Sequence, residues 1–176
     1  MIERLTKGDG MDRRGHEFRY IMSSGFCQGA AVLDAACGTG YGSTLIGDWV
    51  ESYIGVDRDL SALEVPRTRG LGHFVFQEAD LDDWVPDFEF DVFLCFETLE
   101  HVQDPQHVVD MGSLARLWMV MSVPIVPTKH VNPYHLHDFE PGWLEETMEH
   151  YPGWEHYQTV QQPSEASEIA IFGRTR

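Results

Sequence analysis

Short apolar runs recur along most of the chain, separated by more polar segments. Buried parallel strands have this pattern because helices cover both faces of their sheet. Helical stretches lie between the runs, and this alternation predicts an α/β fold with a mostly parallel sheet flanked by helices. The predicted strands are residues 31–35, 53–57, 73–77, 90–96 and 117–123, and the predicted helices are 13–24, 41–49, a short one near 60–66, 105–115 and 142–150.

The pattern changes after Pro124. Residues 124–142 are rich in proline and histidine, which predicts a long ordered loop. Residues 156–161 and 168–174 then predict a closing antiparallel hairpin, which brings the sheet to seven strands. The whole chain, 1–176, is predicted to form one domain, with residues 1–12 as a loose arm.

The most specific segment follows the first predicted strand. Residues 31–42 read AVLDAACGTGYG, so an apolar run ends in Asp34 and continues into Gly38, Gly40 and Gly42. Glycines at such a turn let the backbone take unusual dihedral angles and approach a ligand closely. The dinucleotide fingerprint G-x-G-x-x-G would need a glycine at Ser43, so the spacing disfavours an NAD-dependent enzyme.

This segment resembles the first motif of class I S-adenosylmethionine (SAM) methyltransferases, V-L-D-x-G-C-G-T-G, with Ala36 where those enzymes often have a further glycine. Three later segments extend the resemblance over roughly residues 15–176: YIGVD at 53–57, QEADL at 77–81 and ETLEHV at 97–102. The acid that ends YIGVD lies about twenty residues past the glycine loop, where a carboxylate can accept both ribose hydroxyls.

The resemblance implies a Rossmann-like sheet of order 3-2-1-4-5-7-6 with strand 7 antiparallel, and SAM as the cofactor. It places Asp34 near the methionine amino group, Asp80 at the adenine amino group and the Leu81 backbone at the ring edge. The residues that it implies for SAM binding are Asp34, Cys37, Gly38, Gly40, Asp57, Arg58, Asp80, Leu81 and Glu97.

Carboxylates and imidazoles gather after the fourth predicted strand. If a helical turn begins at residue 97, Glu97, Glu100 and His101 share one face. Glu-x-x-Glu-His resembles a metal motif of ubiquinone-biosynthesis O-methyltransferases and of small-RNA 2′-O-methyltransferases. The second group adds a later histidine, which His137 matches, so the resemblance implies a magnesium or manganese site. Two metal-free readings stay open: the cluster braces the fold, or His101, His135 or His137 acts as a general base.

The net charge limits which partners the protein can bind, and the cysteine content indicates its compartment. The formal net charge of −17 disfavours long nucleic acids and anionic membrane surfaces, because both repel an acidic protein. No segment approaches the roughly twenty apolar residues of a membrane span. Three cysteines without a Cys-x-x-Cys spacing argue against a zinc knuckle or a disulfide framework and favour a reducing compartment, the cytoplasm.

Together these features predict a SAM-dependent methyltransferase that acts on a small polar molecule, at a hydroxyl of a sugar, glycan or phenolic metabolite. Two alternatives remain: an N-methyltransferase for a small amine, and a SAM-binding module without catalysis. Because no inserted domain is available, residues 1–24, 96–104 and 124–143 must form the acceptor pocket. A homo-oligomer in which a second subunit completes that pocket is left open.

Overall fold

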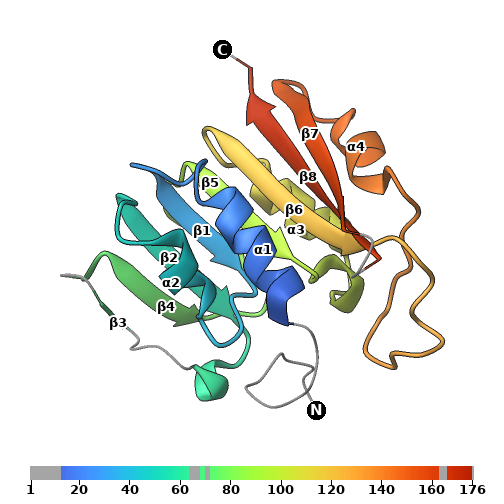
Figure 1. The fold of residues 1–176 in the computed structure, drawn as a ribbon, viewed down its shortest axis with the longest axis horizontal. Helices are drawn as coiled ribbons and strands as arrows, with labels where there is room; N and C mark the ends of the chain where they lie inside the picture. Colours follow the sequence, from blue (N-terminus) through green and yellow to red (C-terminus); the bar gives the residue numbers. More distant parts are fainter. Residues whose placement is uncertain (1–12, 64–67, 70–71, 163–165, 176) are drawn as a thin grey trace.

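The computed structural model describes residues 13–63, 68–69, 72–162 and 166–175, so the predicted arm at 1–12 lies outside the described residues. These residues form one sheet in the order β3-β4-β2-β1-β5-β6-β8-β7 (Figure 1). Its strands are β1 (Ala31–Ala35), β2 (Ser52–Asp57), β3 (Thr68–Arg69), β4 (Phe74–Glu78), β5 (Val92–Phe96), β6 (Trp118–Pro124), β7 (Trp154–Gln162) and β8 (Ser167–Arg174). The helices are α1 (Arg13–Ser23), α2 (Gly42–Ile46), α3 (Pro105–Gly112) and α4 (Trp143–Met148), with short 3-10 turns η1 (Leu60–Ala62) and η3 (Leu99–His101).

The strand order confirms the predicted topology. Strands β4, β2, β1, β5 and β6 pair in parallel, β8 is antiparallel to β6, and β7 is antiparallel to β8. Without the edge strand β3, this is the predicted order 3-2-1-4-5-7-6. The sequence does not predict β3, which pairs antiparallel with β4, because a strand of two residues has no hydrophobic period.

Helices cover both faces of the sheet, as the continuous apolar strands require. Figure 1 shows α1 and α2 on one face and α3 on the other. All five residues of β5 are buried. Phe93 and Cys95 pack in one core cluster, while Val92, Leu94 and Phe96 pack in the cluster on the opposite face.

The predicted helix bounds differ most from the structure at α2 and η1. The helix predicted at 41–49 ends at Ile46, because Gly47 takes a φ of +87° and stops the helical repeat. Near 60–66 the described helical part is the turn η1, whose preceding residue Asp59 accepts a hydrogen bond from the N–H of Ser61 at 2.8 Å. Among the described residues, no helix is long and apolar enough to span a membrane.

Candidate active site

A cavity of about 710 Å³ lies where β1, β2, β4 and β5 end. Ligands of open α/β sheets bind at these carboxyl ends, and the volume falls within the range of small-molecule sites. Its walls come from the loops after these strands, from α1 and from the loop after β6; they include His16, Tyr20, Cys37, Gly38, Asp57, Arg58, Asp80, Leu81, Glu97, Glu100, His101, Thr128, Asn132, Tyr134 and His135.

The glycine loop after β1 presents its backbone to this cavity. Ala36, Gly38 and Gly40 all have positive φ, at 62°, 57° and 76°. This left-handed conformation is costly for a residue with a Cβ, which explains why related sequences often place glycine at the position of Ala36. A Cβ added to Gly38 would meet no described atom within 4 Å, so the loop faces open space there.

Asp57, at the end of β2, holds the glycine loop in place. Its Oδ2 accepts the N–H of Gly38 at 2.9 Å, and its Oδ1 accepts the N–H of Asp59 at 3.1 Å. Asp57 itself lines the cavity, and a carboxylate oxygen can accept more than one hydrogen bond. Asp80 and Leu81, which follow β4, line the same cavity.

Seven of the nine residues predicted to bind SAM line the cavity: Cys37, Gly38, Asp57, Arg58, Asp80, Leu81 and Glu97. Gly40 and Asp34 do not. Asp34 lies beneath the loop, where its carboxylate accepts hydrogen bonds from the hydroxyls of Tyr20, at 3.0 Å, and Tyr53. Burial raises the pKa of Asp34 to about 7, although the two tyrosine hydroxyls act in the opposite direction.

Asp34 should make the protein less stable as the pH rises from 5 to 7. Its pKa is about 7 in the folded state and near 3.8 in the unfolded state, so the folded state binds more protons across this interval. This group alone should lower the free energy of unfolding by about 2 kcal/mol between pH 5 and 7. Urea unfolding of the wild type and of Asp34→Asn at both pH values measures the difference. Equal pH dependence of the two proteins would contradict the assignment.

α1 closes one side of the cavity with two further side chains, His16 and Tyr20. Burial, together with the charge of Arg19, lowers the pKa of His16 to about 3, so this imidazole is neutral at physiological pH. The sequence gives no direct signal for the hydrogen bond of Tyr20 to Asp34, because the two residues lie fourteen positions apart on different elements.

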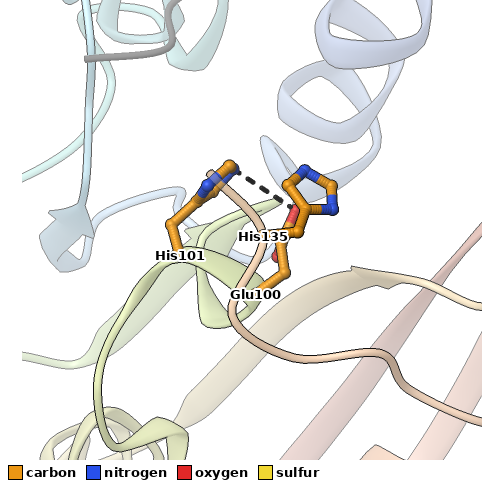
Figure 2. Close-up of side chains that lie close together, drawn as sticks. All are labelled: Glu100, His101 and His135. Carbon is orange, nitrogen blue, oxygen red and sulfur yellow. Dashed lines mark ion pairs between the residues drawn. The ribbon is translucent and has the colours of Figure 1, made fainter. Parts of the chain in front are cut away.

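Glu100, His101 and His135 lie close together, and all three line the cavity (Figure 2). Each offers one ligand atom, and these atoms lie within 4.8 Å of one another. Glu100 is 1% exposed, and its Oε1 lies 3.8 Å from Nε2 of His101. Nδ1 of His101 lies 3.1 Å from the carbonyl oxygen of Tyr134, which can only accept, so Nδ1 carries a proton and Nε2 of the neutral ring has a lone pair.

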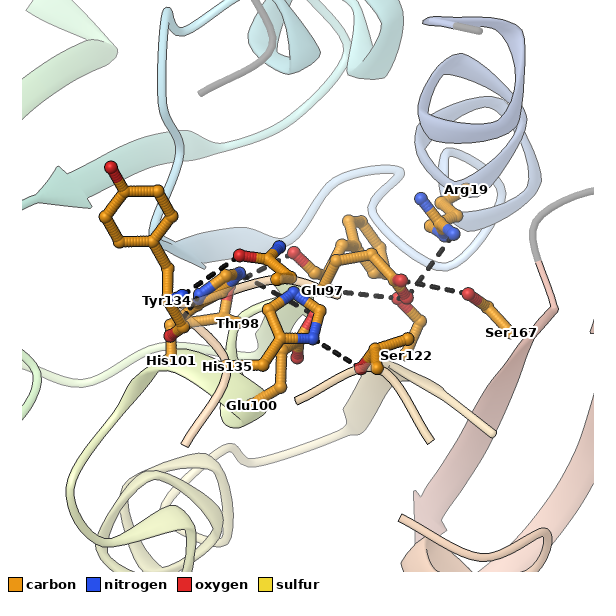
Figure 3. Close-up of polar contacts among 12 residues, drawn as sticks. Arg19, Glu97, Thr98, Glu100, His101, Ser122, Tyr134, His135 and Ser167 are labelled. Carbon is orange, nitrogen blue, oxygen red and sulfur yellow. Dashed lines mark hydrogen bonds and ion pairs between the residues drawn. The ribbon is translucent and has the colours of Figure 1, made fainter. Parts of the chain in front are cut away.

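Glu97 lies apart from this cluster. It has a φ of +49°, and the helical turn begins two residues later, at Leu99, so Glu97 and Glu100 do not share a helical face. Its Oε1 accepts the Ser122 hydroxyl at 2.8 Å and its Oε2 accepts the Ser167 hydroxyl at 2.9 Å. Arg19, which is fully buried, reaches Oε1 at 3.3 Å. Figure 3 shows this carboxylate joining α1, β6 and β8 to the end of β5.

His137 also lies away from the cluster. Its Nε2 donates to the carbonyl of Val102 at 2.9 Å, and it does not line the cavity. The structure therefore brings together Glu100, His101 and His135 from the predicted residues, and not Glu97 or His137. Thr128 and Tyr134, which contact the two histidines, were missed because neither belongs to a recognisable motif.

Comparisons with known proteins agree with this arrangement. Residues 33–112 match a family described as a methyltransferase domain. A probable S-adenosylmethionine-dependent methyltransferase from Mycolicibacterium smegmatis is 30% identical over an alignment of 151 positions, which covers 77% of this chain and 56% of that protein. This chain belongs to the class I SAM-dependent methyltransferases. The family prediction is confirmed, and SAM is the cofactor of the family.

The methyltransferase chain is also similar to one further curated protein and to one solved structure. A ubiquinone biosynthesis O-methyltransferase from Pasteurella multocida is 30% identical over an alignment of 95 positions, which covers 46% of this chain and 39% of that protein. The fold matches the structure of a magnesium protoporphyrin IX methyltransferase from Synechocystis with bound S-adenosylhomocysteine (SAH), with a TM-score of 0.72 at 17% identity over 99% of this chain and 90% of that chain. The chain spans 35% to 56% of the length of the first curated relatives.

Proposed function

We propose that the chain transfers a methyl group from SAM to a hydroxyl of a small polar acceptor. The observation that carries this proposal is that one cavity contains both the glycine loop with Asp57 and the cluster of Glu100, His101 and His135. The glycine loop with Asp57 suits a nucleoside cofactor and is called the cofactor end. The cluster suits an acceptor hydroxyl that must lose a proton and is called the acceptor end.

The residues at the cofactor end suit a nucleoside. Gly38 leaves open space against the loop, and the carboxylate of Asp57, which lines the cavity, would accept the ribose hydroxyls. The exposed carboxylate of Asp80 and the backbone of Leu81 would hold the adenine. When bound, SAM would supply a methyl group on a positively charged sulfur.

At the acceptor end, the chain's own residues would orient the hydroxyl and take its proton. The lone pair on Nε2 of His101 can accept that proton, since an ordinary imidazole titrates near neutral pH. The buried carboxylate of Glu100, 3.8 Å away, would stabilise the imidazolium that forms. Holding the hydroxyl in line with the methyl group would contribute much of the rate.

The cofactor site can be tested by calorimetric titration with SAH and with NAD. We expect the wild type to bind SAH and not NAD, and Asp57→Ala to weaken SAH binding by about 1.5–3 kcal/mol, because hydrogen bonds to a charged group are lost. Asp87→Ala, which removes an exposed acid that does not line the cavity, is the matched control and should bind SAH normally. Normal SAH affinity in Asp57→Ala would contradict the assigned ribose site.

The reaction itself is tested with isotope-labelled SAM and two acceptor pools, one of hydroxyl compounds (sugars and phenols) and one of small amines. We expect the label in a methyl ether from the first pool. Label only in the amine pool would overturn the hydroxyl proposal in favour of N-methylation. SAH binding without transfer to either pool would favour a SAM-binding module.

A divalent metal at Glu100, His101 and His135 is a second candidate for the acceptor end, favoured by the convergence of three ligand atoms within 4.8 Å. Two imidazoles and one carboxylate suit manganese, iron or zinc better than magnesium. A bound ion would lower the pKa of the acceptor hydroxyl. If the ion is needed, a chelator should abolish methyl transfer, a divalent ion should restore it, and SAH affinity should not change. Full transfer in the presence of the chelator would exclude the metal and leave proton removal to the histidines.

A further inference from the structure

The loop between β6 and α4 is closed by one carboxylate. Oδ1 of Asp138 accepts the backbone N–H of Thr128 at 2.7 Å and that of Lys129 at 3.0 Å. The carbonyl of Thr128 in turn accepts the N–H groups of Val131, at 2.9 Å, and Asn132, at 2.8 Å. Residues 128–138 therefore form a loop whose two ends are joined by hydrogen bonds; it is called the 128–138 loop below.

The 128–138 loop is hydrogen-bonded to the turn η3 that carries Glu100 and His101 and to the residue after it. The carbonyl of Glu100 accepts the N–H of Leu136 at 2.6 Å, and the side chain of His137 donates to Val102. Nδ1 of His101 donates to the carbonyl of Tyr134. The position of the 128–138 loop therefore sets where His135 lies relative to His101. The centroids of the two imidazoles are 4.6 Å apart.

Within the 128–138 loop, Thr128 contacts the side chain of His135 directly. The Oγ1 atom of Thr128 lies 2.5 Å from Nδ1 of His135, and the backbone N–H of His135 donates to the carbonyl of Asn132 at 3.2 Å. Since Nδ1 contacts Thr128, an acceptor or an ion at His135 would have to bind at Nε2. A hydroxyl can donate or accept, so this contact decides which nitrogen carries the proton.

We propose that Thr128 is a positioning residue that accepts a hydrogen bond from Nδ1–H of His135 and so keeps a lone pair on Nε2, and that Asp138 holds Thr128 in place. His101 has the same arrangement, with its Nδ1–H donated to a carbonyl. Partners of this kind fix the orientation and the tautomer of a functional histidine. The proposal rests on the proposed function in one respect: His135 must act on the acceptor or on an ion.

The first test is nitrogen NMR of the histidine side chains in the ligand-free protein, with the His135 signals assigned by their loss in His135→Gln. We expect Nδ1 of His135 to be protonated in the wild type and in Thr128→Ser, which keeps the hydroxyl. In Thr128→Val, which keeps the shape without the hydroxyl, we expect a mixture of tautomers. Protonation at Nε2 in the wild type, or an unchanged tautomer in Thr128→Val, would overturn the proposal.

The second test compares kcat, KM and SAH affinity in the same variants. Thr128→Val should lower kcat by about 10–100-fold, the usual effect of removing such a partner, with SAH affinity unchanged, and Thr128→Ser should restore most of kcat. Asp138→Ala should change the His135 NMR signals, whereas Glu140→Ala, which removes another exposed acid of the same loop, should not. Unchanged His135 signals in Asp138→Ala would remove Asp138 from the proposal.

The two tests separate this proposal from the proposed function. If His135→Gln keeps full methyl transfer while Thr128→Val changes the tautomer, Thr128 sets the tautomer and His135 has no role in the reaction. If His135→Gln is inactive and Thr128→Val changes neither the tautomer nor kcat, the proposed function stands and the role of Thr128 is wrong.

Discussion

Replacing His101 or His135 by alanine should lower the turnover of methyl transfer by about 10²–10⁴-fold, the loss typical of a missing general base. Both side chains line the acceptor end of the cavity beside the buried carboxylate of Glu100. Their contacts with Tyr134 and Thr128 are to the loop after β6 rather than to the glycine loop, so calorimetry should show unchanged SAH affinity. If the two histidines act as one unit, the double variant should lose little more than either single variant.

His137→Ala is the matched control for these variants. Its imidazole donates to the carbonyl of Val102 and does not line the cavity, so this variant should lose far less turnover than the other two. Full activity of both His101→Ala and His135→Ala would show that the cluster only supports the fold. Catalysis would then rest on positioning, which would favour an amine acceptor that needs no base.

The architecture could be predicted because its signals are local. The central strands β1, β5 and β6 are mostly apolar runs of five to seven residues and are almost fully buried, and the glycines after β1 identify the first strand of the sheet. The order of the remaining strands then follows from the family resemblance. The bounds of α2 and η1 were less predictable, because single residues such as Gly47 and Asp59 end or begin these helical segments.

The cofactor end was largely predictable for the same reason, since its residues follow strands directly. Asp34 shows the limit of this reasoning. An acid at the end of a strand can point toward the ligand or beneath the loop, and here Tyr20 and Tyr53 form hydrogen bonds to it below the loop. These tyrosines come from α1 and β2, so no spacing within the motif reveals the contact.

The acceptor end was less predictable, because its geometry depends on contacts between distant segments. The spacing of Glu97, Glu100 and His101 suits one helical face, but the turn begins at Leu99. The sequence pattern favours His137, which precedes an acid and a phenylalanine, whereas the structure places His135 in the cluster. The hydrogen bonds of Thr128 to His135 and of Val102 to His137 distinguish them, and they link positions 7 and 35 residues apart.

The carboxylate of Glu97 should be worth more to stability than any surface ion pair of the protein. Within the described part of the chain, it forms the one ion pair of Arg19, which is fully buried on α1. Glu97→Gln keeps the size of the side chain and leaves the buried guanidinium charge without its counter-ion. Breaking a buried pair in this way costs about 3–5 kcal/mol, because the remaining charge stays desolvated.

Urea unfolding without ligand measures this cost, and Glu89→Gln provides the matched control. Glu89 also pairs with an arginine, Arg116, at 2.9 Å, but its side chain is 83% exposed, so its loss should cost no more than about 1 kcal/mol. Arg19→Met combined with Glu97→Gln removes the buried charge as well and should recover much of the lost stability. If Glu97→Gln and Glu89→Gln unfold at the same urea concentration, Glu97 does not hold α1 to the sheet through Arg19. If the double variant is no more stable than Glu97→Gln, the loss comes from the hydrogen bonds to Ser122 and Ser167 rather than from the unpaired charge.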